Sequence, residues 1–266
     1  MAQEGFKYEE NAYKALDKYG ISTGGVAGAS HDKPDLTIKN SVQTSTGCEL
    51  KNSPTAAGSL VMKYYDGKWD YGEFKKTEIE KVFLYDLGEK FKLLTEMNER
   101  GTAGKNWRGK IPALQNDKLG KKILMPGVKD KRVAYKLDIE KFGAKNEVHI
   151  KVPAKAICDY YIKKKCSYIN VGTHGFYTLN GKDDLDLNKK LKIAGENQIP
   201  DFAKSASAEI RVRCQYKGGG DYQFVMTLQF GKMTKSPYNI APIRAGSKSE
   251  IDTQKLEKDP ILAAFK

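Results

Sequence analysis

Two acidic residues and a lysine lie close together in the segment KPDLTIKNSVQTSTGCELKNS, which spans residues 33–53. Asp35 precedes one short apolar pattern, and Glu49 and Lys51 lie two residues apart in the next. Carboxylates are hard oxygen ligands for Mg²⁺, and a lysine ammonium stabilises negative charge that develops on a phosphate. These residue types at this spacing predict metal-dependent hydrolysis of a phosphodiester bond. The competing interpretation is the polar side of a surface hairpin.

The two strands that would carry these residues follow from a sequence period of two. The segments DLTIK and GCELK each alternate apolar and polar side chains, with a polar turn between them. Leu50 faces inward, so Glu49 and Lys51 project together from the opposite face. If the strands are neighbours, Asp35 and Glu49 can share a divalent ion, with the Leu50 carbonyl as a third ligand. Lys51 would then orient the attacking water, assist its deprotonation or stabilise charge on the phosphate.

An amphipathic helix is predicted ahead of this hairpin. Glu9, Ala12, Tyr13 and Leu16 recur at helical spacing, and Gly20 is the expected stop. An acidic residue therefore heads an otherwise apolar face.

The Pro-Asp pair at 34–35 and the Glu-Leu-Lys triplet at 49–51, with the helix pattern E-x-x-A-x-x-x-L-x-x-x-G upstream, resemble a known family. This is the PD-(D/E)xK nucleases, the restriction-endonuclease-like superfamily. The resemblance covers about residues 5–65 and consists of a short motif. It implies an α/β fold with a mixed central β-sheet flanked by helices, followed here by a β-rich C-terminal part.

The resemblance also assigns roles to individual side chains. Asp35 and Glu49 would be metal ligands, and Lys51 would be the catalytic lysine. In members similar to archaeal Holliday-junction resolvases, a helix of this kind supplies an additional acidic residue. Here that residue would be Glu9, with Glu10 as the fallback. The implied cofactor is Mg²⁺, with Mn²⁺ as a substitute.

Other candidate residues fit this chemistry less well. Asp66 begins an Asp-Gly-Lys triplet, but Asp-Gly is a turn signature and no strand precedes it. Asp201 follows a proline, but the next comparable triplet begins at Glu209 and ends in arginine, whose pKa is too high for proton transfer. His31 precedes the hairpin and is interpreted as a solvated loop residue.

Net charge favours a polyanionic partner. The chain has 46 Lys and Arg residues against 33 Asp and Glu, a formal net charge of +13. Basic side chains that contact phosphates release condensed counterions, so nucleic acid is the favoured partner. Two basic stripes are candidates for backbone contacts, although each fits a solvated face equally well. They comprise Lys163, Lys164 and Lys165 at a predicted helix end, and Arg211, Arg213 and Lys217 on one strand face.

Composition predicts four consecutive segments. Residues 1–100 would form the nuclease core, and residues 101–131, rich in Gly, Lys, Pro and Asn, a basic flexible insertion. Residues 132–235 are β-rich, with a hairpin across GGG, and would complete the fold or bind substrate. Residues 236–266 read as a polar tail.

Two further helices are predicted. Thr77 and Glu80 form a capping-box signature for a long amphipathic helix through Leu94, with Gly88 as the expected interruption. The segment PAKAICDYYIKKK predicts a shorter helix that ends in lysines.

The expected setting is the cytoplasm, without membrane contact. No stretch reaches the roughly 18 apolar residues of a membrane span, and MAQEGFKYEENAYK has no apolar signal region. The four cysteines form neither a C-x-x-C pair nor a Cys/His cluster, which favours free thiols in a reducing compartment.

The sequence thus leads to the expectation of a Mg²⁺-dependent DNA endonuclease, of restriction or junction-resolving and repair type, acting on double-stranded or branched DNA. Two alternatives stay open. One is a non-catalytic basic nucleic-acid-binding protein with a degenerate nuclease fold, and the other is a ribonuclease that uses the same site. Cleavage of both strands with one site per chain would favour a homodimer.

Overall fold

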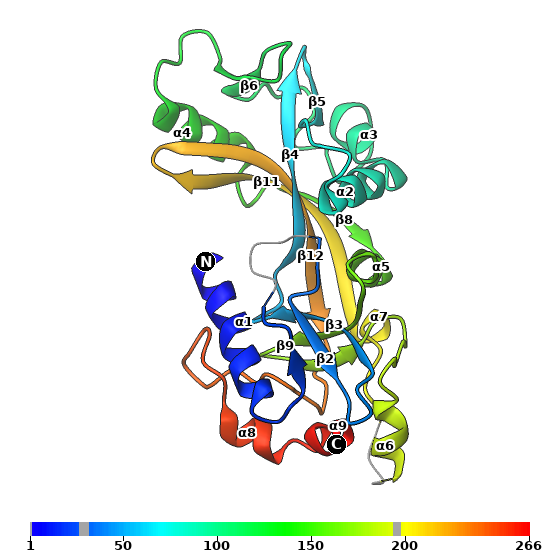
Figure 1. The fold of residues 1–266 in the computed structure, drawn as a ribbon. Coiled ribbons are helices and arrows are strands. Elements are labelled where there is room, and N and C mark those ends of the chain that lie inside the picture. Colours follow the sequence, from blue (N-terminus) through cyan, green and yellow to red (C-terminus); the bar gives the residue numbers. More distant parts are fainter. Residues whose placement is uncertain (1, 27–31, 194–197) are drawn as a thin grey trace. The chain divides into compact units, whose positions relative to one another are not determined.

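The computed structural model describes residues 2–26, 32–193 and 198–266. The fold is mixed α/β with several sheets (Figure 1). Contacts between residues divide the chain into two compact units. Unit 1 comprises Met1–Thr55, Pro153–Ser207 and Phe230–Lys266, and unit 2 comprises Ala56–Val152 and Ala208–Gln229.

Unit 1 is built on a five-stranded mixed sheet in the order β1-β2-β3-β9-β10. The strands are β1 (Ser22–Thr23), β2 (Leu36–Lys39), β3 (Ser45–Lys51), β9 (Cys166–Val171) and β10 (Gly175–Thr178). Strands β1, β2 and β3 form an antiparallel meander, β9 pairs with β3 in parallel, and β10 pairs with β9 antiparallel. The sheet therefore joins the predicted hairpin to a strand more than a hundred residues later in the chain.

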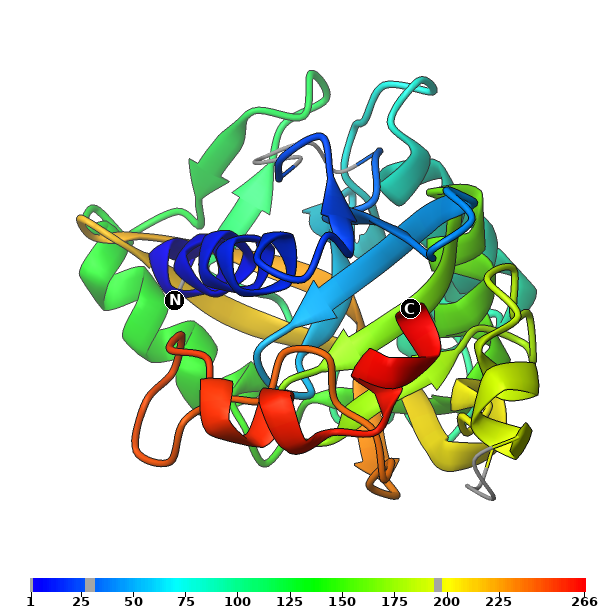
Figure 2. The same cartoon turned by 60° about the horizontal axis from the view of Figure 1, so that its bottom comes forward.

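Helices cover this sheet and close its core. They are α1 (Ala2–Asp17), α5 (Lys155–Lys163), α6 (Leu187–Ile193), α7 (Phe202–Ser205), α8 (Thr253–Lys258) and α9 (Ile261–Phe265). Figure 2 shows α1, α8 and α9 on the near side of the sheet, where their side chains share a core with Cys48 and Leu50 of β3. The predicted N-terminal helix is confirmed, and Gly20 follows it with a positive φ of 69°.

Unit 2 contains a curled antiparallel sheet in the order β5-β4-β12-β11-β8 (Figure 1). Its strands are β4 (Ala56–Tyr65), β5 (Lys68–Tyr71), β8 (Val148–Val152), β11 (Ala206–Gly218) and β12 (Asp221–Met233), the last two extending into unit 1. The other elements are α2 (Ile79–Lys90), α3 (Leu93–Asn98), β6 (Leu114–Asn116), β7 (Lys122–Leu124) and α4 (Lys131–Phe142). The hairpin predicted across GGG is confirmed, because β11 and β12 are adjacent and only Gly219 and Gly220 separate them.

An aromatic cluster forms the centre of unit 2. Trp69 and Trp107 lie with ring centroids 4.8 Å apart, and Phe142 and Phe224 pack edge-on against both. Trp107 is fully buried, although it belongs to the segment predicted as a flexible insertion. Burial of so large a ring ties residues 101–131 to the core of unit 2.

The observed units differ from the four consecutive segments predicted from composition. Strand β4 follows the site hairpin directly in sequence, yet it pairs with β12 from the other end of the chain. Residues 56–100 therefore belong with residues 208–229, not with residues 1–55. Local composition could not show this, because the division depends on pairing between distant strands.

The helix expected to run from Thr77 to Leu94 divides at a different place. The prediction of a capping box at Thr77 is wrong, because the N-cap residue is Glu78 and its side chain makes no capping hydrogen bond. Gly88 stays helical and lies against Tyr71, whose hydroxyl would be 2.3 Å from an added Cβ. The break falls at Lys92, which adopts a left-handed conformation with φ 54°.

The remaining expectations about the setting are answered in part. Cys48, Cys158, Cys166 and Cys214 are all buried free thiols, as predicted. Within the described ranges, no helix is both long enough and apolar enough to cross a membrane.

Gly47 allows the close approach on which the hairpin depends. A Cβ at Gly47 would lie 2.5 Å from both the Lys165 carbonyl oxygen and Pro34 Cγ. We expect Gly47→Ala to destabilise the protein by about 1–3 kcal/mol, because backbone and proline must shift to admit the methyl group. Gly5→Ala is the matched control, since an added Cβ there meets nothing within 4 Å. Chemical denaturation of both variants checks this, and equal stabilities would contradict it.

Candidate active site

Asp35 immediately precedes β2 and lies beside β3, the strand that carries Glu49 and Lys51. The register of β2 and β3 places Leu36 opposite Cys48. The Leu50 backbone N–H donates to Asp35 Oδ2 at 2.9 Å, and the carboxylate is almost fully buried. The predicted hairpin is therefore confirmed, with Asp35 held against β3 by a backbone hydrogen bond.

Glu49 and Lys51 project from the same face of β3, as their spacing predicts. Lys51 Nζ lies 2.6 Å from Glu49 Oε1 and 4.0 Å from Asp35 Oδ2. Glu49 is only 1% exposed, so this is an interior ion pair. Both carboxylates thus approach one ammonium group, whereas Cys48 and Leu50 enter the core on the other face.

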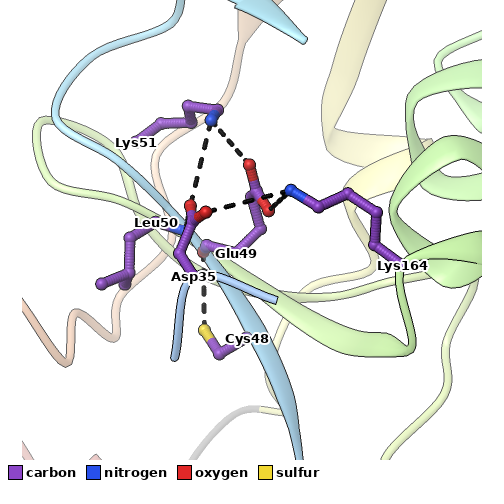
Figure 3. Close-up of polar contacts among 6 residues, drawn as sticks. All are labelled: Asp35, Cys48, Glu49, Leu50, Lys51 and Lys164. Atoms are coloured by element: carbon purple, nitrogen blue, oxygen red, sulfur yellow. Dashed lines mark hydrogen bonds and ion pairs between the residues drawn. The ribbon is translucent and has the colours of Figure 1, made fainter. Parts of the chain in front are cut away.

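A second lysine completes the cluster, and sequence analysis did not place it there. Lys164 Nζ lies 2.7 Å from Glu49 Oε2 and 3.9 Å from Asp35 Oδ1 (Figure 3). Lys164 is 4% exposed, while its neighbours Lys163 and Lys165 are exposed. It follows α5, which leads directly into β9, and the parallel pairing of β9 with β3 brings it to Glu49.

Helical spacing was the signal that could have revealed Lys164. It lies three residues after Tyr161 and four after Tyr160, both of which are buried on α5. Side chains at these separations share a helix face. Lys164 therefore continues the inward face of α5, and the three consecutive lysines are not equivalent.

Tyr161 supports both ammonium groups. Its ring centroid lies 5.7 Å from Lys51 Nζ and 5.4 Å from Lys164 Nζ. An ammonium over an aromatic face is stabilised by the ring quadrupole, more strongly when water is excluded. The Tyr161 hydroxyl is buried and has no hydrogen-bond partner among the described residues.

Burial and the ion pairs shift the protonation of these groups in different directions. Burial, with a smaller contribution from Glu49, raises the pKa of Asp35 to about 6. Burial would also raise the pKa of Glu49, but Lys51 and Lys164 outweigh it and hold that pKa below its ordinary value. Burial opposes the charge on Lys51, yet Glu49 and Asp35 raise its pKa. Glu49 and Lys51 therefore stay charged at neutral pH.

Glu9 of α1 is the third predicted carboxylate. Burial, followed by repulsion from Asp35, raises the pKa of Glu9 to about 8. Its Oε2 atom is buried without a hydrogen-bond partner within the described ranges. Glu10 is exposed, so Glu9 and not the fallback residue faces the interior.

Carboxylate oxygens are the ligands that a hard divalent cation prefers. Three carboxylates influence one another, and one of their oxygen atoms, Glu9 Oε2, is buried and unsatisfied. As the side chains stand, the described residues include no group of three or more His, Cys, Asp or Glu that could hold a metal ion. Asp35 and Glu49 share two ammonium groups instead. The roles of these residues and of the Leu50 carbonyl as ligands stay predictions.

The β11 residues predicted to contact nucleic acid, Arg211, Arg213 and Lys217, belong to unit 2. Arg211 Nε donates to Glu147 Oε2 at 2.6 Å, so its charge is already paired. Arg213 Nε is buried with no hydrogen-bond partner in the described part of the chain, and Lys217 is exposed. Their contacts with nucleic acid, like those of Lys163 and Lys165, stay predictions.

The competing motif residues have other positions. Asp66 lies in a turn, as predicted, but the expectation that no strand precedes it is wrong, because β4 ends at Tyr65 and β5 begins at Lys68. Asp201 caps α7 by accepting the Ala203 N–H. His31 lies outside the described residues.

Comparison with protein-family models, with curated proteins and with solved structures found no match to this chain. Buried carboxylates on adjacent strands can bind a cation, and ammonium groups beside them can stabilise an anion.

The two carboxylates should differ in their effect on stability. Glu49 contacts both lysines at 2.6 and 2.7 Å, whereas the closest lysine contacts of Asp35 are 3.9 and 4.0 Å. We expect Glu49→Gln to destabilise the metal-free protein by about 3–5 kcal/mol, because it leaves buried ammonium groups without their charged partner. Asp35→Asn should cost about 1–2 kcal/mol. Urea denaturation in EDTA measures both, and a larger loss for Asp35→Asn would refute this order.

The proton on Glu9 should make stability depend on pH. The folded protein keeps this proton to a pKa of about 8, higher than in the unfolded chain. The resulting stabilisation is fully present below the unfolded pKa, about 4.3, and is lost as pH rises to about 8. We expect wild type to lose about 2 kcal/mol more than Glu9→Gln between pH 5 and 9, after allowance for partial exposure. Denaturation in EDTA at each pH measures the free energy of unfolding. An equal decrease with pH for the two proteins would contradict the prediction.

Proposed function

We propose that this protein is a Mg²⁺-dependent endonuclease that hydrolyses DNA phosphodiester bonds, of restriction or junction-resolving and repair type. In this proposal the mixed sheet of unit 1 with α1 and α5 corresponds to a restriction-endonuclease-like core. The observation that carries the proposal is the convergence of Asp35, which immediately precedes β2, and Glu49 of the adjacent strand β3 on the ammonium of Lys51.

Asp35 and Glu49 are the proposed holders of the cation. Both are buried, and β2–β3 pairing and the Leu50 N–H fix their positions. Glu9 would supply the third carboxylate, since its oxygen Oε2 lacks a hydrogen-bond partner among the described residues. Bound Mg²⁺ would polarise the phosphate and lower the pKa of the attacking water.

Lys51 is the proposed partner of the phosphate. Its contacts with Glu49 and Asp35 raise its pKa, so the side chain retains its proton. Of the three roles open to it, a protonated lysine favours stabilisation of developing negative charge over removal of a proton from water. The carboxylates also fix the direction of the ammonium, so little reorganisation would be needed.

The DNA partner is supported by the formal net charge of +13. Exposed Lys163 and Lys165 adjoin the buried Lys164 and are candidates to contact backbone phosphates near the carboxylates. A homodimer would provide two sites for cleavage of both strands. The buried free thiols fit a reducing, cytoplasmic setting.

A second candidate function is favoured by the charge balance of the cluster. Two ammonium groups neutralise two carboxylates, which is an arrangement that a purely structural, non-catalytic nuclease fold would also have. In that case the protein would bind nucleic acid without cleaving it.

Plasmid cleavage tests the proposal directly. We expect wild type to nick supercoiled DNA with Mg²⁺ or Mn²⁺ and to be inactive in EDTA. Asp35→Asn and Lys51→Met should each lower the rate at least about 100-fold, because they remove a proposed ligand or charge stabilisation. A parallel reaction with RNA of the same length distinguishes a ribonuclease.

Asp66→Asn is the matched control, because Asp66 begins the competing Asp-Gly-Lys triplet in the turn between β4 and β5. Its cleavage rate should equal that of wild type. Absence of metal-dependent cleavage of either nucleic acid by folded wild-type protein would reject catalysis and favour the binding-only function.

A further inference from the structure

We infer that Lys164 is a built-in competitor for the divalent cation, whose ammonium occupies the Asp35–Glu49 carboxylate pair and must leave when a metal binds. This inference rests on the proposed function. It adds a residue outside the Pro-Asp and Glu-Leu-Lys motifs that sets how tightly the site binds metal.

The position of the Lys164 ammonium carries the inference. Its Nζ lies between Glu49 Oε2, at 2.7 Å, and Asp35 Oδ1, at 3.9 Å, while Lys51 contacts the other oxygen of each carboxylate (Figure 3). A cation held by Glu49 and Asp35 would need the space that this ammonium occupies. Oxygen atoms bind Mg²⁺ at about 2.1 Å and Ca²⁺ at about 2.4 Å, so the ammonium and the metal cannot both remain.

Charge reinforces this steric conflict. A divalent ion beside two ammonium groups in a buried site would be strongly repelled, since a pair of unit charges 4 Å apart interacts appreciably even at an effective dielectric constant of about 20. Lys51 is partly exposed, with 21% of its side chain accessible, whereas the Lys164 side chain is 5% accessible. Removal of the Lys164 charge therefore relieves the larger, more deeply buried repulsion.

Two aromatic rings also lie beside the Lys164 ammonium. Its Nζ lies 5.4 Å from the ring centroid of Tyr161 and 5.9 Å from that of Tyr160. Aromatic faces stabilise an ammonium without a carboxylate. Because these rings lie beside the ammonium, its charge would keep a favourable partner when it leaves the carboxylates.

Calorimetric titration of metal-free protein with CaCl₂ tests the inference without turnover. We expect Lys164→Met, which keeps the chain length and removes the charge, to lower the dissociation constant for Ca²⁺ at least about tenfold. Lys189→Met is the matched control, because it makes the same substitution at an exposed residue of α6 in the same unit, and its affinity should equal that of wild type. Circular dichroism establishes that each variant is folded.

Each outcome has a distinct meaning. Tighter binding by Lys164→Met than by a wild type that also binds Ca²⁺ supports both the inference and the proposed metal site. Equal or weaker binding by the variant overturns the inference alone. Binding by the variant but not by wild type supports competition and overturns the proposed Mg²⁺-dependent activity. Absence of binding by both overturns both.

A structure of wild type with Ca²⁺ decides the matter if Lys164→Met does not fold. We expect the Lys164 ammonium to have left Glu49 Oε2. An ammonium still within hydrogen-bond distance of that oxygen, with Ca²⁺ on the same carboxylates, would falsify the inference. No Ca²⁺ at the carboxylates would count against both the inference and the metal site.

Discussion

The buried pairing of Glu49 with two lysines is the interaction on which the candidate site depends. A carboxylate 1% exposed is tolerable only if opposite charges compensate its lost hydration. Lys51 comes from the same strand, but Lys164 reaches Glu49 only because β9 runs parallel to β3 and α5 precedes it. The charge balance of the site thus depends on the mixed sheet and on the position of α5 before β9.

That constraint also explains why the neighbouring residues differ in character. Cys48 and Leu50 alternate with Glu49 and Lys51 along β3, so that one face joins the apolar core and the other holds the ions. Tyr161 lines the ionic side with a ring that contacts both ammonium groups. The apolar core on one side and the aromatic ring on the other lower the local dielectric constant, which strengthens the charge interactions within the site.

Local periodicity was sufficient for part of this arrangement. The alternation of β3 predicted that Glu49 and Lys51 share a face, and the helical stripe predicted α1 with Glu9 in it. The same reasoning treated Lys164 as one of three equivalent basic residues, although its spacing from Tyr160 and Tyr161 indicates the inward face of α5. Its approach to Glu49, in contrast, depends on the pairing of β3 with β9. The two units escaped prediction for the same reason, since β4 pairs with β12 across most of the chain.

The separation of Glu49 and Lys164 has a consequence for how the protein is made. The two residues are 115 positions apart, and most of unit 2 is encoded between them. A nascent chain therefore exposes the acidic hairpin long before α5 and β9 leave the ribosome. Domains fold as their segments become available during synthesis. The ion pairs of Glu49 and Asp35 with Lys164 therefore form late. A truncated product that ends before residue 153 would contain Asp35, Glu49 and Lys51 but lack Lys164.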